Sequence, residues 1–525
     1  MGTFGSTSTS GSQARWGCGS VAALAMTRSA ADLMDGCAVR ETHFSILLFL
    51  GDQVLKLRKP LRFDFADFST PSARAEDCRR EVDLNRRLAP DVYLGTAEVV
   101  MGGVVLDHLV VMRRLPANRS LANLVCSAPE TVWGVPLDAV ARTLADFHAR
   151  ADRSPEISAN ASMKAVRDEF EANVTATARF VGPLLEPRAH DPVVGAVRNF
   201  LAGRESLFAD RITSGQICDG HGDLQAGDIY CLDDGPRILD CLEFDDRLRV
   251  GDVAADVAFL AMDLERLGNP AAALRFVCEY DELSGDKPPP SLLHTYIALR
   301  AYVRVKVACL RHEQGDHESA GEAVRLLELA QNHLERGRVR LVVVGGLPGS
   351  GKSTLADELG RSLDAIVLHS DDLRREASNL IADRAPATSV GGGRYTPERT
   401  QAVYLHLIDS ARQHLGLGVS VVLDASWIDP SNRGLARKLA VDSFADLTEL
   451  HCTAPPSVTE RRIAKRLRHG GDPSEATVEI ARAMARLEVS WPSATDLDTA
   501  RPPAVVLADA LRVVGHRIDG MWSRG

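Results

Sequence analysis

The sequence predicts two different folds in one chain, a mixed α+β fold followed by a parallel α/β fold. Residues before about 335 pass between short strand-like runs and long stretches of helical periodicity, whereas the last third alternates single strands with helices. A glycine-rich loop, GGLPGSGKST at 345–354, stands between a buried strand and a helix at the start of that last third. The 525 residues are enough for about three folding units.

We therefore expect three segments. Residues 1–25 are rich in Gly, Ser and Thr without periodicity, which predicts a disordered tail. Residues 26–335 are expected to form the front domain and 338–520 the back domain. The boundary follows Gly337, a residue type that commonly ends a helix, directly before the buried strand.

Composition narrows the classes of function. The chain has 71 acidic and 61 basic residues, and the net charge of −10 disfavours a dedicated nucleic-acid binder. No apolar run approaches the roughly 18–20 residues that cross a bilayer, so we expect no membrane span. Ten cysteines at irregular spacing predict free thiols in a reducing, cytoplasmic setting. The oligomeric state stays open.

The front domain begins with a hairpin signal. Two short runs, SILLFL and QVLKL, alternate apolar and polar residues and are separated by Gly51-Asp52. The pattern then predicts, in order, a helix at 72–89, a strand at 104–113, helices over 137–210, a strand-rich region at 227–244 and helices over 252–335.

The back domain repeats strand and helix. Strands are predicted at 338–344, 365–369, 419–425 and 447–454, each followed by helical periodicity. Such alternation predicts a parallel sheet with helices on both faces.

The glycine-rich loop fits the phosphate-binding pattern G-x-x-x-x-G-K-[ST] in full. Its glycines allow backbone N–H groups to surround a phosphate at a helix N-terminus. Lys352 is expected to reach the β- and γ-phosphates of ATP, and Ser353 to offer its hydroxyl to Mg²⁺. The residues predicted to bind the nucleotide are Gly346, Leu347, Pro348, Gly349, Ser350, Gly351, Lys352, Ser353 and Thr354.

Further polar residues follow at the ends of the next strands. Asp371 follows the carboxyl end of a predicted strand, which is where ligands bind to parallel sheets. Its carboxylate could accept the proton of a substrate hydroxyl. Asp424 ends a strand and could hold Mg²⁺, or serve only as a turn residue. Arg462 and Arg466 share a helix face and could close over the phosphates, or form a solvated charged face.

Residues 338–515 resemble small-molecule P-loop kinases such as gluconate kinase, chloramphenicol phosphotransferase and the kinase domain of polynucleotide kinase. The resemblance lies in GGLPGSGKST, SDDLR, VVLDASW and the spacing from Pro455 to Arg462 and Arg466. It implies that Asp371 acts on the acceptor hydroxyl and that the two arginines form a lid. SDDLR is especially similar to polynucleotide kinase, which leaves a nucleic-acid 5′-hydroxyl open as an acceptor.

The front domain carries a second catalytic pattern, in HGDLQAGDIY at 221–230. Asp223, Asp228 and Asp240 have the spacing of a kinase catalytic loop followed by a metal-binding aspartate. Asp223 would take the acceptor's proton, while Asp228 and Asp240 would hold Mg²⁺.

Such a site also needs a lysine on a strand and a glutamate on a helix. Lys56 lies on the second strand of the hairpin and Glu81 in the helix that follows. Lys56 would hold the α- and β-phosphates, with Glu81 orienting it. The order of lysine, glutamate, HGD and aspartate supports this assignment more than Lys56 alone does.

Residues 40–310 resemble the aminoglycoside phosphotransferase family, a branch of the two-lobed protein-kinase-like fold. The segments in which this resemblance lies include VLKLRKPLRFDFADFST, REVDLNRRLAPDVYLG, DFHAR, DGHGDL and ILDCLEFDDRLRVGDVAADVAFLAMDLE. The order of the two domains also resembles bacterial fusion proteins described as phosphotransferase-like plus ATP-binding.

Two positions depart from the family pattern HGDLH-x-GN. Gln225 replaces the histidine and Asp228 replaces the asparagine. Asp228 places a third carboxylate near Asp223 and Asp240, and like charges in one site raise at least one pKa.

The sequence thus predicts a kinase that uses ATP and Mg²⁺ to phosphorylate a hydroxyl of a small molecule, such as a sugar, an amino sugar or an aminoglycoside-like compound. Two alternatives stay open. In one, only the P-loop domain catalyses and the front domain is weakly active or regulatory. In the other, the chain is a polynucleotide 5′-hydroxyl kinase.

Overall fold

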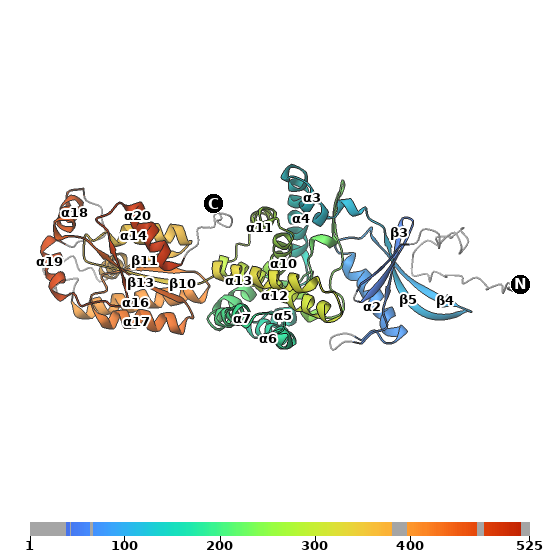
Figure 1. The fold of residues 1–525 in the computed structure, drawn as a ribbon. Helices are drawn as coiled ribbons and strands as arrows, with labels where there is room; N and C mark the ends of the chain where they lie inside the picture. The colour runs from blue at the N-terminus through green and yellow to red at the C-terminus, as the bar shows by residue number, and fades with distance from the viewer. Residues whose placement is uncertain (1–37, 43, 63–66, 381–395, 470–476, 516–525) are drawn as a thin grey trace, which may run out of the picture. The chain divides into compact units, whose positions relative to one another are not determined.

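The computed structural model describes residues 38–42, 44–62, 67–380, 396–469 and 477–515 (Figure 1). The tail predicted for residues 1–25 lies outside the described residues. Contacts divide the chain into two compact units. Unit 1 holds the described residues up to Ala161 together with Gly215–Lys287, and unit 2 holds Ser162–Ser214 and the described residues from Pro288 onward. The boundary predicted near residues 335–338 falls inside unit 2, and as a boundary between folds it stays a prediction.

Unit 1 begins with an antiparallel sheet in the order β1-β2-β3-β5-β4. The predicted hairpin is confirmed, since β2 pairs with β3 from Ser45–Arg58 to Leu50–Gln53. Helix α2, Pro71–Asn85, covers one face, where Cys78 and Val82 pack against Val54 and Val110. The strands are β1 Ala38–Glu41, β2 Ser45–Leu50, β3 Gln53–Arg58, β4 Tyr93–Met101 and β5 Val104–Arg113.

The rest of unit 1 is mostly helical. Its longest helix, α4, packs against α11, which in turn packs against α10. Two small antiparallel pairs, β6–β9 and β7–β8, frame the segment that carries HGDLQAGD. The elements are α3 Leu121–Ser127, α4 Glu130–Arg150, α5 Pro155–Ala159, β6 Ile217–Asp219, β7 Ile229–Leu232, β8 Gly235–Ile238, α9 Asp246–Arg249, β9 Val250–Asp252, α10 Val253–Arg266 and α11 Pro270–Ser284.

One predicted strand region ends early. The sequence placed strand-like residues up to 244, but β8 ends at Ile238. Asp240 adopts a left-handed backbone with φ of 63°, which turns the chain out of the hairpin.

Unit 2 contains a group of helices and a parallel sheet. Helix α12 pairs with α13, and α7 packs against α13. The helices of this group are α6 Met163–Thr177, α7 Pro187–Ala202, α8 Glu205–Thr213, α12 Pro290–Glu313 and α13 Ser319–Arg336.

The sheet has the order β11-β12-β10-β13-β14, and every neighbouring pair is parallel. The predicted parallel α/β fold is therefore confirmed. The strands are β10 Arg340–Gly345, β11 Ile366–His369, β12 Val421–Asp424, β13 Asp446–Thr453 and β14 Thr495–Asp498. The sequence did not predict β14, whose residues TDLD lack an apolar run.

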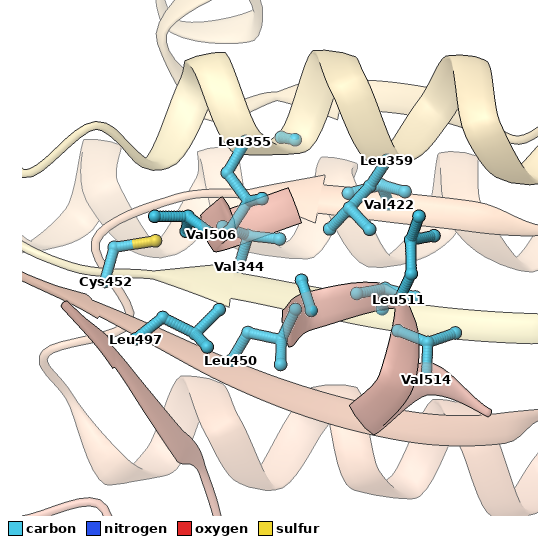
Figure 2. Packing of buried hydrophobic residues seen from close by; sticks show 13 residues of the cluster. Val344, Leu355, Leu359, Val422, Leu450, Cys452, Leu497, Val506, Leu511 and Val514 are labelled. Atoms are coloured by element: carbon cyan, nitrogen blue, oxygen red, sulfur yellow. The ribbon is translucent and has the colours of Figure 1, made fainter. Parts of the chain in front are cut away.

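Helices cover both faces of this sheet, with α14 and α20 on one side and α16 and α17 on the other (Figure 1). Figure 2 shows the core under α14, where Leu355 and Leu359 meet Val344 from β10 and Val506 and Leu511 from α20. The helices are α14 Lys352–Leu363, α15 Ser370–Leu380, α16 Pro397–Gly416, α17 Pro430–Asp442, α18 Pro456–His469, α19 Val478–Leu487 and α20 Pro503–Val514.

None of the described helices combines the length and the apolar character that crossing a membrane requires.

Candidate active sites

The glycine-rich loop joins a buried strand to a helix. Strand β10 is buried along its whole length, and α14 starts at Lys352 directly after the loop. Gly351 adopts a left-handed backbone at the N-cap of α14, with φ of 90°. Gly349 has φ of 79°, and a Cβ there would lie 2.7 Å from the carbonyl oxygen of Thr459. Only glycine fits this close turn, which brings the backbone to the helix N-terminus in the arrangement that binds phosphate.

A cleft of about 640 Å³ lies in front of the loop. The structure brings most of the predicted residues of the back domain together in its lining, namely Gly349, Gly351, Lys352, Ser353, Thr354, Asp371, Asp424, Arg462 and Arg466. Gly346, Leu347, Pro348 and Ser350 belong to the loop but not to the lining. Cations and carboxylates thus meet in one concave site, as phosphate and metal binding require.

His369 holds the buried carboxylate of Asp424. Its Nδ1 lies 2.8 Å from Asp424 Oδ2, and its Nε2 lies 3.2 Å from Asp357 Oδ1 on α14. Burial works to raise the pKa of Asp424, but the charge of Lys352 and the hydrogen bonds from His369 and Ser353 outweigh it and lower that pKa. Asp424 is therefore ionised at neutral pH. No motif in the sequence singles out His369, because its partners are remote in sequence.

Asp371 lies in the first turn of α15, directly after β11. Its Oδ1 forms an ion pair with Nη1 of Arg374, one turn further along the same helix. Arg374 therefore fixes the position of the carboxylate at the edge of the cleft.

Arg462 ties the glycine-rich loop to the end of the sheet. Its Nη1 donates to the carbonyl of Gly349 at 3.3 Å, and its Nη2 donates to the carbonyl of Thr499 at 2.7 Å. The hydroxyl of Thr499 also contacts the carbonyls of Ser350 and Thr453. Thr499, directly after β14, thus braces the loop, a contact that no motif in the sequence indicated.

In unit 1, Lys56 lies between two carboxylates. Its Nζ is 2.8 Å from Glu81 Oε1 and 2.6 Å from Asp240 Oδ1. Burial works to lower the pKa of Lys56, but the charges of Asp240 and Glu81 outweigh it and raise that pKa. The charge of Lys56 lowers the pKa of Asp240. Strand β3, helix α2 and the turn after β8 thus place these three predicted residues together.

The predicted pair Asp223 and Asp228 lies in the same region. Gln225 Nε2 donates to Asp223 Oδ2 at 2.9 Å. Burial, followed by the charges of Asp240 and Asp223, raises the pKa of Asp228 well above its usual value. The crowding of carboxylates expected from the replacement of asparagine is present in the structure.

Asp256 on α10 braces the loop that carries Asp223. Its carboxylate accepts hydrogen bonds from the backbone N–H of His221 at 2.6 Å and of Gly222 at 2.9 Å. His148 Nε2 lies 3.3 Å from the same carboxylate, and Tyr280 holds the other ring nitrogen of His148 at 2.7 Å. These contacts fix the backbone of the loop from behind.

Arg58 fills a group of three buried carboxylates next to Lys56. Its guanidinium contacts Asp77 at 2.6 Å, Glu81 at 3.1 Å, and also Glu243. Because Arg58 supplies the positive charge, this acidic group needs no metal ion. Glu81 thereby links Arg58 to Lys56.

Both sites have donor atoms that suit Mg²⁺, a hard cation that prefers oxygen ligands. In unit 2, Asp424 Oδ1 is buried without a hydrogen-bond partner, and the carboxylate of Asp424 interacts with the hydroxyl of Ser353. In unit 1, a cation would relieve the repulsion that raises the pKa of Asp228.

The glycine-rich loop, the parallel sheet and the strand-end carboxylates define a P-loop nucleotide-binding domain. Residues 341–488 match a family of P-loop domains described as "AAA domain".

Most of the chain is similar to known mycobacterial proteins. It is 41% identical over 465 residues to the uncharacterized protein Rv2004c of Mycobacterium tuberculosis (strain ATCC 25618 / H37Rv). This match covers 88% of the chain and 92% of the relative. The uncharacterized protein Mb2027c of Mycobacterium bovis matches equally well. The chain therefore belongs to the family of these mycobacterial proteins.

Solved structures of kinases are similar to parts of the chain. A sugar kinase from Janibacter sp. HTCC2649 is 22% identical and covers 35% of this chain and 99% of its own, with a TM-score of 0.28. The Mycobacterium tuberculosis APS kinase CysC, in complex with AMPPNP and APS, is 25% identical. The match covers 34% of this chain and 99% of the APS kinase chain, with a TM-score of 0.27. Wild-type aminoglycoside 2′-phosphotransferase-IIIa, solved as its GDP complex, is 17% identical. The match covers 56% of this chain and 93% of the phosphotransferase chain, with a TM-score of 0.34.

Proposed function

We propose that this protein is an ATP-dependent phosphotransferase that acts on a hydroxyl of a small molecule. The observation that carries the proposal is that one cleft joins Lys352 and Ser353 of the glycine-rich loop to Asp371 and Asp424. A phosphate-binding lysine, a buried metal-binding carboxylate and a carboxylate suited to general-base catalysis are the parts that phosphoryl transfer needs.

In this proposal the residues of unit 2 have separate tasks. Lys352 and the loop hold the β- and γ-phosphates, while Ser353 and Asp424 would hold Mg²⁺, which neutralises phosphate charge. Asp371 accepts the proton of the acceptor hydroxyl as its oxygen bonds to the γ-phosphorus. The bond from that phosphorus to the β–γ bridging oxygen breaks, and ADP leaves. Arg462 and Arg466 stabilise the charge on the transferred group.

Unit 1 is proposed to hold a second ATP site. Lys56, oriented by Glu81, would contact the α- and β-phosphates, and Asp223 would be the base. Asp228 and Asp240 would hold Mg²⁺. Gln225 supports this assignment, because its hydrogen bond to Asp223 fixes the carboxylate that must meet the acceptor.

One observation favours a regulatory role for unit 1 instead. The raised pKa of Asp228 favours its protonated form, which is a poor metal ligand. In that case unit 1 binds a nucleotide or another ligand without turnover, and unit 2 alone catalyses.

The test is transfer of labelled γ-phosphate from ATP to a panel of sugars, amino sugars and aminoglycosides. The proteins compared are wild type, Lys352→Ala, Asp223→Ala and the double variant. If both sites are active, we expect each single variant to lose part of the phosphate transfer and the double variant to lose all of it. Loss of all transfer in Lys352→Ala would assign catalysis to unit 2 alone. Lys438→Ala on α17, whose partner is the exposed Asp442, is the matched control and should keep full activity.

The panel also contains DNA and RNA 5′-hydroxyl ends across a salt series. The net charge of −10 predicts no binding of these ends even at low salt. Transfer to sugars or amino sugars without transfer to nucleic acid supports the proposal. Transfer to nucleic acid alone would contradict it. Wild-type protein that labels no compound of either kind would also contradict it.

A further inference from the structure

A second cavity in unit 2 lies away from the glycine-rich loop. It has a volume of about 340 Å³ and is lined by parts of α7, α12, α13 and the starts of β10 and β13. None of its lining residues lines the ATP cleft. Val339 lines it just before β10, whereas the glycine-rich loop follows the opposite end of that strand. The two hollows are therefore separate sites.

Arg204 is a buried cation in the wall of this cavity. The residue is only 1% exposed. Its Nη1 donates to the main-chain carbonyls of Gly203 at 2.8 Å and Ser443 at 2.7 Å, and its Nε has no hydrogen-bond partner. Within the described part of the chain, no carboxylate forms an ion pair with Arg204. Burial lowers the pKa of Arg204 to about 10, against the opposing charge of Asp446.

The carboxylates near the cavity pair with another arginine and not with Arg204. Glu335 and Asp446 both pair with the more exposed Arg338, at 2.7 Å and 3.0 Å. Arg340 is 7% exposed and donates to the main-chain carbonyls of Arg338 and Glu335. Near the cavity, Arg204, Arg338 and Arg340, which itself lies outside the lining, thus outnumber the two carboxylates. The two buried arginines donate their hydrogen bonds to carbonyl groups, and the guanidinium of Arg204 also lies over the ring of Phe200 at 5.6 Å. Buried charges in proteins are normally paired, which indicates a missing anion.

We propose that this cavity binds a small organic anion, whose phosphate or carboxylate group pairs with Arg204. A planar guanidinium matches the oxygens of either group. Val193, Phe200 and Leu334 in the lining would contact the body of the ligand. The site is distinct from the proposed transfer sites, and binding there does not require phosphotransferase activity.

The test measures the rise in melting temperature caused by glycerol phosphate and by citrate, which represent the two anion chemistries. Saturating Mg·AMPPNP is present throughout, so that the nucleotide sites are occupied. We expect at least one anion to raise the melting temperature of wild type, and Arg204→Met to lose that rise. Arg198→Met, on α7 outside the cavity lining and paired with the half-exposed Glu171, should keep it. A response to only one of the anions identifies the group that Arg204 binds.

A second variant keeps Arg204 and fills the cavity. Gly195 lies in its lining on α7, and a Cβ built there meets no atom within 4 Å. Gly195→Leu should therefore fold and lose the rise in melting temperature that the anion causes. This variant tests whether the cavity binds the anion even if Arg204→Met is unstable. An equal response in Gly195→Leu and wild type would overturn the proposal, as would no response of wild type to either anion. A response lost in Lys352→Ala but kept in Gly195→Leu would place the anion in the ATP cleft and would also overturn it.

Discussion

Arg58 shows how strongly a single buried charge can matter in unit 1. Its partners Asp77, Glu81 and Glu243 are all buried, and Glu81 alone among them also pairs with Lys56. Removing the guanidinium therefore leaves Asp77 and Glu243 without the positive charge that compensates them. We predict that Arg58→Leu lowers the free energy of unfolding by about 3–5 kcal/mol, measured by urea denaturation. Arg62→Ala is the control, because its pair with Asp67 is exposed and contributes about 0–1 kcal/mol. Equal stability of the two variants would contradict the assignment.

His369 gives unit 2 a dependence on pH. The hydrogen bond to Asp424 is the main cause that raises the pKa of His369 above its usual 6.5. Because the folded state binds the proton more tightly, the stabilisation is fully present below about pH 6.5 and is lost as pH rises through the raised pKa.

We therefore predict that His369→Asn destabilises unit 2 by about 1–2 kcal/mol near pH 6 and by less at pH 9. Melting temperatures of wild type and variant across this range, without added Mg²⁺, measure the difference. His414→Asn, at the C-terminal end of α16, is the control and should leave the pH dependence of wild type in place. A difference between wild type and His369→Asn that stays constant with pH would show that the imidazolium does not contribute.

The sequence allowed some residues of the sites to be placed and not others. Lys56, Glu81 and Asp240 were found because their order along the chain follows a pattern, and the structure brings them within ion-pair distance. Thr499 and His369 were missed because their partners are far away in the chain, and neither lies in a motif. Their importance comes from tertiary contacts, which periodicity and spacing do not report.

At the scale of elements, the glycine-rich loop depends on backbone geometry. A side chain at Gly349 would need a positive φ and would meet the Thr459 carbonyl at 2.7 Å and Ile463 at 3.0 Å. We predict that Gly349→Ala displaces the loop and weakens binding of Mg·ATP by roughly tenfold or more, about 1.4 kcal/mol, measured by calorimetry. Far-ultraviolet circular dichroism should stay unchanged.

Gly434→Ala is the matched control for this change. Gly434 lies in α17, and a Cβ there meets nothing within 4 Å. The substitution should leave nucleotide binding intact and raise stability by about 0.4–1 kcal/mol, because alanine restricts the unfolded chain. Equal nucleotide affinity in the two glycine variants would contradict the proposed role of the loop.

Elements with a strong pattern were predicted, and weakly patterned ones were not. The hairpin of β2 and β3 and the apolar strands β10 and β12 follow from alternation or from buried runs. Strand β14 is short and polar, and its place at the edge of the sheet is set by pairing with β13. Pairing between strands, rather than propensity, decides such an edge strand.

At the scale of the whole molecule, the chain joins two unrelated candidate sites for nucleotide phosphates. Alternation of single strands and helices predicted the parallel sheet of unit 2 correctly. No pattern in the sequence indicated that the helices of residues 162–214 and 288–337 group with that sheet in unit 2. This grouping depends on contacts such as Arg204 to Ser443 and Ser291 to Gly418, between segments more than one hundred residues apart.

Calorimetric titration of the full chain with Mg·AMPPNP shows whether the cleft in front of Lys352 binds the nucleotide phosphates. We expect saturable binding to wild type and the loss of one binding event in Lys352→Ala, while Lys438→Ala behaves as wild type. No heat of binding to wild type, or an isotherm for Lys352→Ala identical to that of wild type, would contradict it.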